Sequence, residues 1–309
     1  MIRRVELLFS FAVLFLALAP HTQAAAGVQH RQDTPLPQPP QGADSALALP
    51  PRAWAVAAAA NEYAILHHTG SYLRYRTHTV DEKGDKVREI IESRDGSVAR
   101  LLLLNGKPIT PAQDAAEHQR LQDMLDSPDA FARHVKNDES SRKLADTTLH
   151  LFPDAMLYTY VPGQPQSGTN NGALEVVLDY QPNPAFVPPS TTAEALTGLR
   201  GRLWIDVTTR NLVRMEGDIF RPVNFGWGMI ARVYPGGKLL LVQTSTQPAT
   251  RSGRWIFSLF SDQVNIRAVL VKSLSVHNSI ETSDYQTLPA PISYQDAIHL
   301  LLATPLPTH

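Results

Sequence analysis

Three of the eleven histidines lie close together in the sequence and are the first candidates for a metal site. His67 and His68 stand at the end of a predicted helix, and His78 stands on a predicted strand that follows it. Adjacent residues on a helix point about 100° apart, so His67 and His68 cannot easily share one ion. A histidine near the C-terminal end of a helix more often interacts with the helix dipole. We therefore predict no metal site.

Nucleophilic and acid–base chemistry has two further candidates. Ser140–Lys143 contains a Ser-x-x-Lys, but the Ser-Asp-Asn and Lys-Thr-Gly motifs that accompany it in penicillin-recognising enzymes do not occur. Asp206, Glu216 and Asp218 stand on neighbouring predicted strands that also carry arginines, which favours cross-strand ion pairs over paired catalytic carboxylates. We therefore expect a protein that is not an enzyme and that has no cofactor. An enzyme is the third and least supported alternative.

Charge and cysteine content exclude further classes of function. The chain has 28 basic and 29 acidic residues and a net charge of −1, so it has no basic excess with which to bind nucleic acid. It has no cysteine, which excludes disulfides, thiolate catalysis and thiolate-ligated metals. The absence of cysteine also excludes the acylated residue that anchors a bacterial lipoprotein.

Aromatic side chains in the C-terminal half point to apolar binding rather than to catalysis. Trp227 lies between Gly226 and Gly228, a pattern that predicts a turn or a bulge. The aromatic cluster is either a tight core under a corner of a sheet or the mouth of an apolar cavity. The candidate ligand-binding residues are Trp204, Phe220, Phe225, Trp227, Trp255 and Phe257.

Residues 1–26 have the composition of a secretory signal peptide. Arg3 and Arg4 precede an apolar run from Val5 to Ala19, and Ala24–Ala26 offers small residues for cleavage. The run is shorter than the roughly 20 residues of a spanning helix, which favours cleavage over an uncleaved membrane anchor. We expect a periplasmic or secreted protein that is not membrane-anchored once the signal is cleaved.

The remaining chain divides into a linker and one domain. Residues 27–51 include six prolines among Gln, Gly and Ala, and they predict an extended, disordered linker. Residues 52–305 are predicted to form a single domain. It begins with a helix at 52–68 and continues through three strands to an inserted pair of helices at 111–144.

Alternating polar and apolar residues predict a long antiparallel meander over residues 198–277. Its expected strands are Gly201–Val207, Leu212–Phe220, Leu239–Thr246, Trp255–Leu259 and Val264–Val276. Helices and strands are segregated along the chain, which indicates an α+β fold with helices packed on one side of a large antiparallel sheet. So many strands rarely stay flat, so we predict a curved half-barrel.

Four motifs stand out together in the sequence: Asn105-Gly106-Lys107-Pro108, Pro182–Ser190, Gly201–Asp206 and Phe225–Gly228. Together they resemble a secreted bacterial family of unassigned function. More loosely, the strand order resembles the LolA/LolB-like fold of lipoprotein carriers and receptors, in which an incomplete barrel wraps a hydrophobic cavity under helices. This resemblance implies a binding or carrier protein for a lipid, acyl chain or other apolar ligand. Without a cysteine, a soluble LolA-like role fits better than a LolB-like receptor.

The alternative is a cell-envelope protein-interaction or sensing module without a small-molecule ligand. The same fold type resembles the sensing domain of RseB, a regulator of the envelope stress response. The proline-rich linker and the charged helix predicted at 127–144 fit this alternative. The expected partners are therefore a lipid, a lipoprotein or an envelope protein, and not nucleic acid.

Overall fold

The computed structural model of the chain describes residues 49–68, 70–163, 165–167, 173–225, 231–248, 250, 252–268 and 274–307. The predicted signal peptide, the predicted linker up to residue 48, and Trp227 lie outside the described residues. Residues 49–51 of the predicted linker belong to the folded part. The Leu49 carbonyl accepts a hydrogen bond from the Tyr160 hydroxyl (2.5 Å), and Pro51 is the first residue of a helix.

The described residues form an α+β fold, as predicted. The helices are α3 (Pro51–Leu66), α4 (Pro111–Asp126), α5 (Pro128–Ala155), α6 (Tyr294–Leu302) and the 3-10 helix η2 (Thr192–Gly198). The strands are β1 (Leu73–Asp81), β2 (Gly84–Ser93), β3 (Gly96–Leu104), β4 (Lys107–Pro108), β5 (Met156–Tyr160), β6 (Gln166–Ser167), β7 (Leu174–Pro182), β8 (Leu199–Asp206), β9 (Leu212–Ile219), β10 (Val223–Phe225), β11 (Ala231–Val233), β12 (Lys238–Gln247), β13 (Ser252–Ala268) and β14 (Leu274–Thr287).

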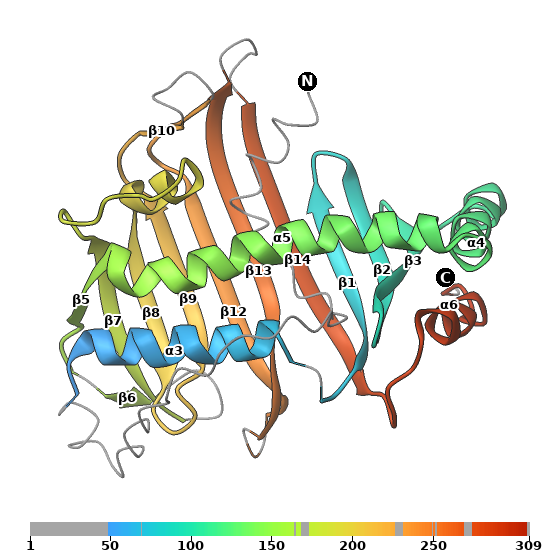
Figure 1. Cartoon of the computed structure of the whole chain (residues 1–309), viewed down its shortest axis with the longest axis horizontal. Coiled ribbons are helices and arrows are strands. Elements are labelled where there is room, and N and C mark those ends of the chain that lie inside the picture. The colour runs from blue at the N-terminus through green and yellow to red at the C-terminus, as the bar shows by residue number, and fades with distance from the viewer. Residues whose placement is uncertain are drawn as a thin grey trace.

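The strands form one open antiparallel sheet, curved like half of a barrel (Figure 1). Their order is β4-β3-β2-β1-β14-β13-β12-β9-β8-β7-β5. Away from this path, β6 pairs with β7, and β11 pairs with both β10 and β13. Since β4 and β5 lie at opposite ends of the order, the sheet does not close.

The inserted helical pair is longer than predicted. α5 continues past the expected end at residue 144 and ends at Ala155. Beyond that end, Ala145, Thr148 and Phe152 keep a helical spacing, and Ala145 and Thr148 are buried. The apolar face therefore continues without a break, and the helix follows it until β5 begins at Met156.

The end of the meander also differs from the prediction. Val264–Val276 is not one strand, because Val264 and Val276 are partners across the β13–β14 pair. Val264 instead belongs with Trp255–Leu259 to the single strand β13. Side chains alternate with the same period in both strands of a hairpin. The alternation in the sequence therefore did not show where β13 ends and β14 begins.

α3 and the C-terminal half of α5 cover one face of the sheet (Figure 1). That face, here called the covered face, has a line of neighbouring side chains from β7 to β12: Leu178, Leu203, Met215 and Leu241. These residues share one core with Trp54 of α3. Side chains alternate along a strand, so the opposite face, here called the open face, has the next line: Asp179, Arg202, Glu216 and Leu240.

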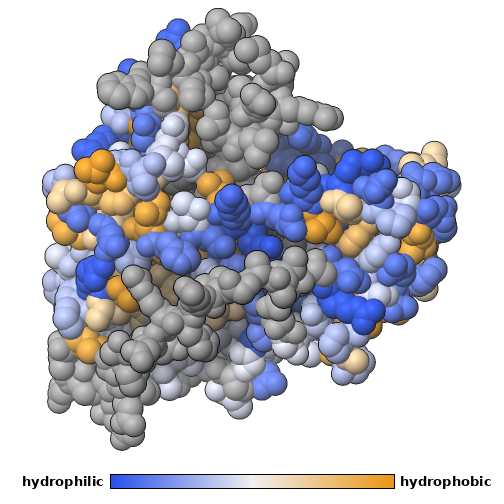
Figure 2. All heavy atoms as spheres, in the orientation of Figure 1, coloured by the Kyte–Doolittle hydropathy of each residue, from blue (hydrophilic) through white to orange (hydrophobic). Residues whose placement is uncertain are grey.

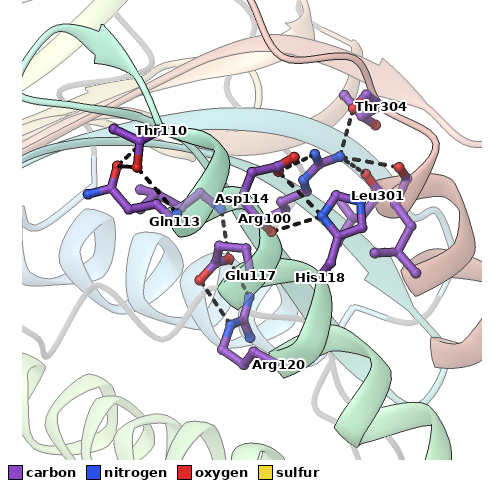
Figure 3. Close-up of polar contacts among 11 residues, drawn as sticks. Arg100, Thr110, Gln113, Asp114, Glu117, His118, Arg120, Leu301 and Thr304 are labelled. Atoms are coloured by element: carbon purple, nitrogen blue, oxygen red, sulfur yellow. Dashed lines mark hydrogen bonds and ion pairs between the residues drawn. The ribbon is translucent and has the colours of Figure 1, made fainter.

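A second core lies at the other end of the sheet, under α4, α6 and the first turns of α5. Phe131 of α5 stacks on Tyr294 of α6, with ring centroids 3.8 Å apart. Buried Arg100 joins these elements (Figure 3). It donates to the carbonyls of Leu301 (2.6 Å) and Thr304 (2.7 Å) at the end of α6, and to Asp114 of α4 (2.8 Å). A cation at the C-terminal end of a helix satisfies its free carbonyls.

Close contact at the centre of the covered face depends on two glycines. Gly201 and Gly217 are partners across β8 and β9, and the buried Tyr180 ring lies over them. The Tyr180 hydroxyl donates to the Glu216 carbonyl (2.9 Å). A Cβ at Gly201 would stand 1.9 Å from that carbonyl oxygen and 2.8 Å from the Tyr180 hydroxyl. No side chain can be added there without displacing backbone.

Gly201→Ala is therefore expected to lower the free energy of unfolding by about 3 kcal/mol, the cost of overpacking against backbone that cannot move aside. Urea unfolding of the purified protein measures this change. Arg202→Ala is the matched control, because Arg202 is the next residue on β8 and forms a half-exposed pair with Asp179. Loss of this pair should lower the free energy of unfolding by less than about 1 kcal/mol. Equal effects of the two substitutions would contradict the packing argument.

Candidate functional site

α3 packs against the sheet with several small side chains. Ala55, Ala57 and Ala58 are buried beside the two larger apolar residues Trp54 and Leu66. The Trp54 indole N–H donates to the Tyr160 hydroxyl (3.1 Å). Small side chains bring a helix close to a sheet, but each of them buries little apolar surface.

Polar contacts hold α3 against α5 at both ends. At the start of α3, Arg52 forms an exposed ion pair with Asp154. At its end, His67 Nε2 lies 2.7 Å from Asp146 Oδ1. The Tyr63 ring contacts the His67 ring, with centroids 4.3 Å apart. The outward side of α5 is a hydrophilic band (Figure 2), so the two helices separate the covered face from solvent.

An apolar cavity of about 50 Å³ lies between these helices and the covered face. We call it the lid cavity. α3 contributes Ala55, Ala58, Ala59 and Glu62; α5 contributes Thr148, Leu149 and Phe152; η2 and the sheet contribute Leu196, Leu199, Leu203, Leu212, Met215 and Leu239. Of these residues, Glu62 alone is ionisable.

Glu62 is only 7% exposed, although it is a carboxylic acid on a surface helix. Its Oε2 accepts a hydrogen bond from buried Gln243 of β12 (2.7 Å), and no described residue donates to Oε1. Burial raises the pKa of Glu62 to about 7, and the hydrogen bond from Gln243 offsets part of that rise. At neutral pH this carboxyl is therefore divided between its neutral and charged forms.

A second apolar cavity, also of about 50 Å³, lies beside η2 and the β10–β11 pair. We call it the end cavity. Most of its lining is apolar: Ala195, Leu199, Ile219, Val223, Phe225, Ala231, Val233, Leu239, Val264, Ile266 and Val276, with Lys238 and Asp262 as its polar members. Leu199 and Leu239 line both cavities. The two cavities are thus neighbours along one apolar path on the covered face.

The open face has a groove of about 670 Å³ that is polar instead of apolar. Its charged side chains mostly pair with each other. Arg202 bonds to Asp179 (2.7 and 3.2 Å), and Lys238 pairs with Asp218 across β9 and β12. A ligand of this groove would have to be polar itself.

The structure does not gather the six predicted aromatic residues in one place. Phe225 lines the end cavity. Trp255 and Phe257 are buried, and Phe257 belongs to the core of the covered face. Trp204 lies on the open face, where the Arg202 and Arg214 guanidiniums approach its ring at 5.9 and 5.4 Å. Phe220 is half-exposed beside Arg200 and Arg221, and Trp227 lies outside the described residues.

The histidines and acids singled out from the sequence have separate partners. His78 lies 2.9 Å from Asp85, and His68 accepts a hydrogen bond from the Ser71 amide (2.8 Å), away from the His67–Asp146 pair. Burial and the nearby Arg254 lower the pKa of His68. Of the three acids, Asp218 makes the expected cross-strand pair with Lys238, Glu216 pairs with Arg214 on its own strand, and Asp206 instead accepts the Thr208 and Thr209 amides (2.8 and 2.7 Å).

Sequence reasoning missed Glu62, Gln243 and Asp262. A signal for Glu62 was present, because it follows a run of four alanines and Asn61 on a helix whose other buried residues are apolar. Gln243 and Asp262 gave no such signal, because polar residues are expected at every second position of a strand. Their burial depends on which face each position occupies.

Comparisons of the chain with known protein families, with curated proteins and with solved structures found no match. None of the helices in the described part of the chain has the length and apolar character to cross a membrane.

The raised pKa of Glu62 predicts how stability changes with pH. The folded state keeps this proton up to about pH 7, whereas the unfolded chain releases it near the ordinary value of 4.5. The stability linked to the proton is complete below pH 4.5 and is lost as the pH rises to about 7. Glu62→Gln has nearly the same shape and no charge. It should be more stable than the natural protein at pH 8 by about 3 kcal/mol.

Urea unfolding at pH 4 and pH 8 tests this expectation. The two proteins should be equally stable at pH 4, and other titrating groups cancel because both proteins contain them. A difference that does not change with pH would show that Glu62 is not neutral in the folded state below pH 7.

Proposed function

We propose that this protein is a secreted, periplasmic binding or carrier protein that takes a lipid, an acyl chain or another apolar ligand beneath α3 and α5. The observation that supports this proposal is the apolar path on the covered face, formed by the lid cavity and the end cavity. Paired helices over a curved sheet leave space for such a ligand, and an apolar lining with few polar groups is typical of small-molecule sites.

Ligand entry requires α3 to move. Each cavity holds about 50 Å³, whereas ligand sites usually hold about 300–1,000 Å³. α3 is the element that we expect to separate, because three of its six buried residues are alanines and its contacts with α5 include partly exposed ion pairs. An acyl chain would replace the apolar contacts that α3 gives up.

The order of elements adds support from resemblance. One helix, a first group of strands, a helical pair and then the remaining strands follow each other, and the helices lie over an open half-barrel. This order resembles the LolA/LolB-like carrier fold. The lack of cysteine favours a soluble LolA-like carrier, with a lipid or a lipoprotein as its cargo.

A second candidate function is a cell-envelope interaction module, and the open face favours it. β5 is an edge strand of the sheet, and Leu157 on β5 is 44% exposed where it lines the open-face groove. An edge strand can pair with a strand of another protein. A ligand-free protein that captures an envelope protein, with capture lost in Leu157→Lys, would favour this candidate.

Native mass spectrometry of protein purified from a periplasm tests the carrier proposal. We expect a stoichiometric lipid mass that is lost on organic extraction. The delipidated protein should then bind a fluorescent fatty-acid probe. A protein that carries no lipid and binds no such probe would contradict the proposal.

Two neighbouring substitutions on α3 locate the site. Ala59→Phe places a ring in the lid cavity and should weaken binding of the probe at least tenfold, because the ring occupies the space of the ligand. Ala60→Phe is the matched control, since Ala60 is exposed and does not line the cavity. Probe titration with both variants measures the difference. Equal binding by the two variants would place the ligand elsewhere.

A further inference from the structure

Asp262 is a buried acid that interacts with the Asn278 side chain without a hydrogen bond of normal geometry. It lies on β13 between Leu239 of β12 and Asn278 of β14, and it is 2% exposed. Neither carboxylate oxygen accepts a hydrogen bond of normal geometry from a described residue. Leaving such a group unsatisfied costs free energy, so an acid in this position calls for an explanation.

Asp262 lines the polar groove of the open face. It also lines the apolar end cavity together with Val264, Ile266 and Phe225. The other polar residue of the lining is Lys238, whose ammonium group pairs with Asp218 and whose side chain is 68% exposed. Among the described residues, Asp262 is therefore the one polar side chain of this cavity that is buried and has no hydrogen bond of normal geometry.

The charges around Asp262 favour a cation. Burial raises the pKa of Asp262 to about 7, Asn278 offsets part of this rise, and the negative charge of Glu82 adds to it. Glu82 is itself held beside β14, where it accepts the His277 amide (2.9 Å). A bound cation would compensate the charge of Asp262, whereas a carboxylate head would be repelled by it.

The end cavity also continues the proposed acyl site. Leu239 is the direct cross-strand partner of Asp262, and it lines both cavities together with Leu199. A single amphiphile can thus extend along this path, with its chain under α3 and its head beside Asp262.

We propose that the end cavity is a head-group subsite that accepts the ammonium head of a cationic amphiphile on the Asp262 carboxylate. This inference rests on the proposed binding function and adds the chemical class of the ligand. It assigns Asp262 as a specificity-determining residue: the ammonium group donates hydrogen bonds to the two free oxygens, and the aliphatic chain fills the path past Leu199 and Leu239.

Three probes with the same chain and different heads test the proposal: dodecylammonium, dodecanol and dodecanoate. Their binding to the delipidated full-length mature protein is measured by calorimetry at pH 8, below the concentrations at which they form micelles. We expect dodecylammonium to bind at least tenfold more tightly than dodecanol, and dodecanoate to bind most weakly. Asp262→Asn keeps the shape and removes the charge, so it should abolish the preference for ammonium and leave binding of dodecanol within about twofold.

Two further variants separate Asp262 from the other acids. Asp179→Asn removes an exposed acid of the open face and should keep the preference. Glu62→Gln removes the buried acid of the lid cavity, and loss of the preference in this variant alone would place the head there and overturn the proposal.

The outcomes also distinguish failure of the head-group subsite from failure of the apolar binding function. Equal binding of all heads, or a preference that persists in Asp262→Asn, would overturn the head-group subsite while the apolar binding function stands. Failure of all three probes to bind would remove the binding function, and the subsite with it.

Discussion

The structure depends on one constraint: an open antiparallel sheet with one apolar face must keep that face from water. α3 and α5 do this over the half of the sheet between β5 and β13, and α4 and α6 do it at the other end. Over the first half, the cover includes α3, whose buried side combines three alanines with Trp54, Glu62 and Leu66. On the proposed function, the sheet offers its apolar surface to a ligand when α3 moves.

On the proposed binding function, the polar groups of the covered face determine the chemical class of the ligand. An apolar path alone selects for length and shape, and it accepts most chains that fit. Burial raises the pKa of both Glu62 and Asp262 to about 7, so each carboxyl is divided between its neutral and charged forms at pH 7. Glu62 lines the lid cavity and Asp262 lines the end cavity. On the proposed binding function, the path would distinguish ligands by their polar heads and not only by their chains, because the charge states of these two acids change in the physiological range.

The sequence predicted the class of the fold well and the site poorly, for physical reasons. Alternation along β8 placed Leu203 and Ile205 inward, as observed, because a period of two depends only on the strand itself. The face of the sheet that an aromatic residue occupies depends also on irregularities in strand pairing. A bulge in β13 between the partners of Val242 and Gln243 changes the alternation, so that both Phe257 and Phe260 join the covered core. Such a shift leaves no mark in the pattern of residue types.

α5 also has a mechanical role. Its first turns are fixed to the second core through Phe131 and Tyr294, and its last turns lie in the core of the covered face. A helix that packs into two cores cannot tilt in one of them without disturbing its contacts in the other. α5 thus connects the two cores. For this reason the two halves of the sheet should melt in a single cooperative transition, although each has its own apolar centre.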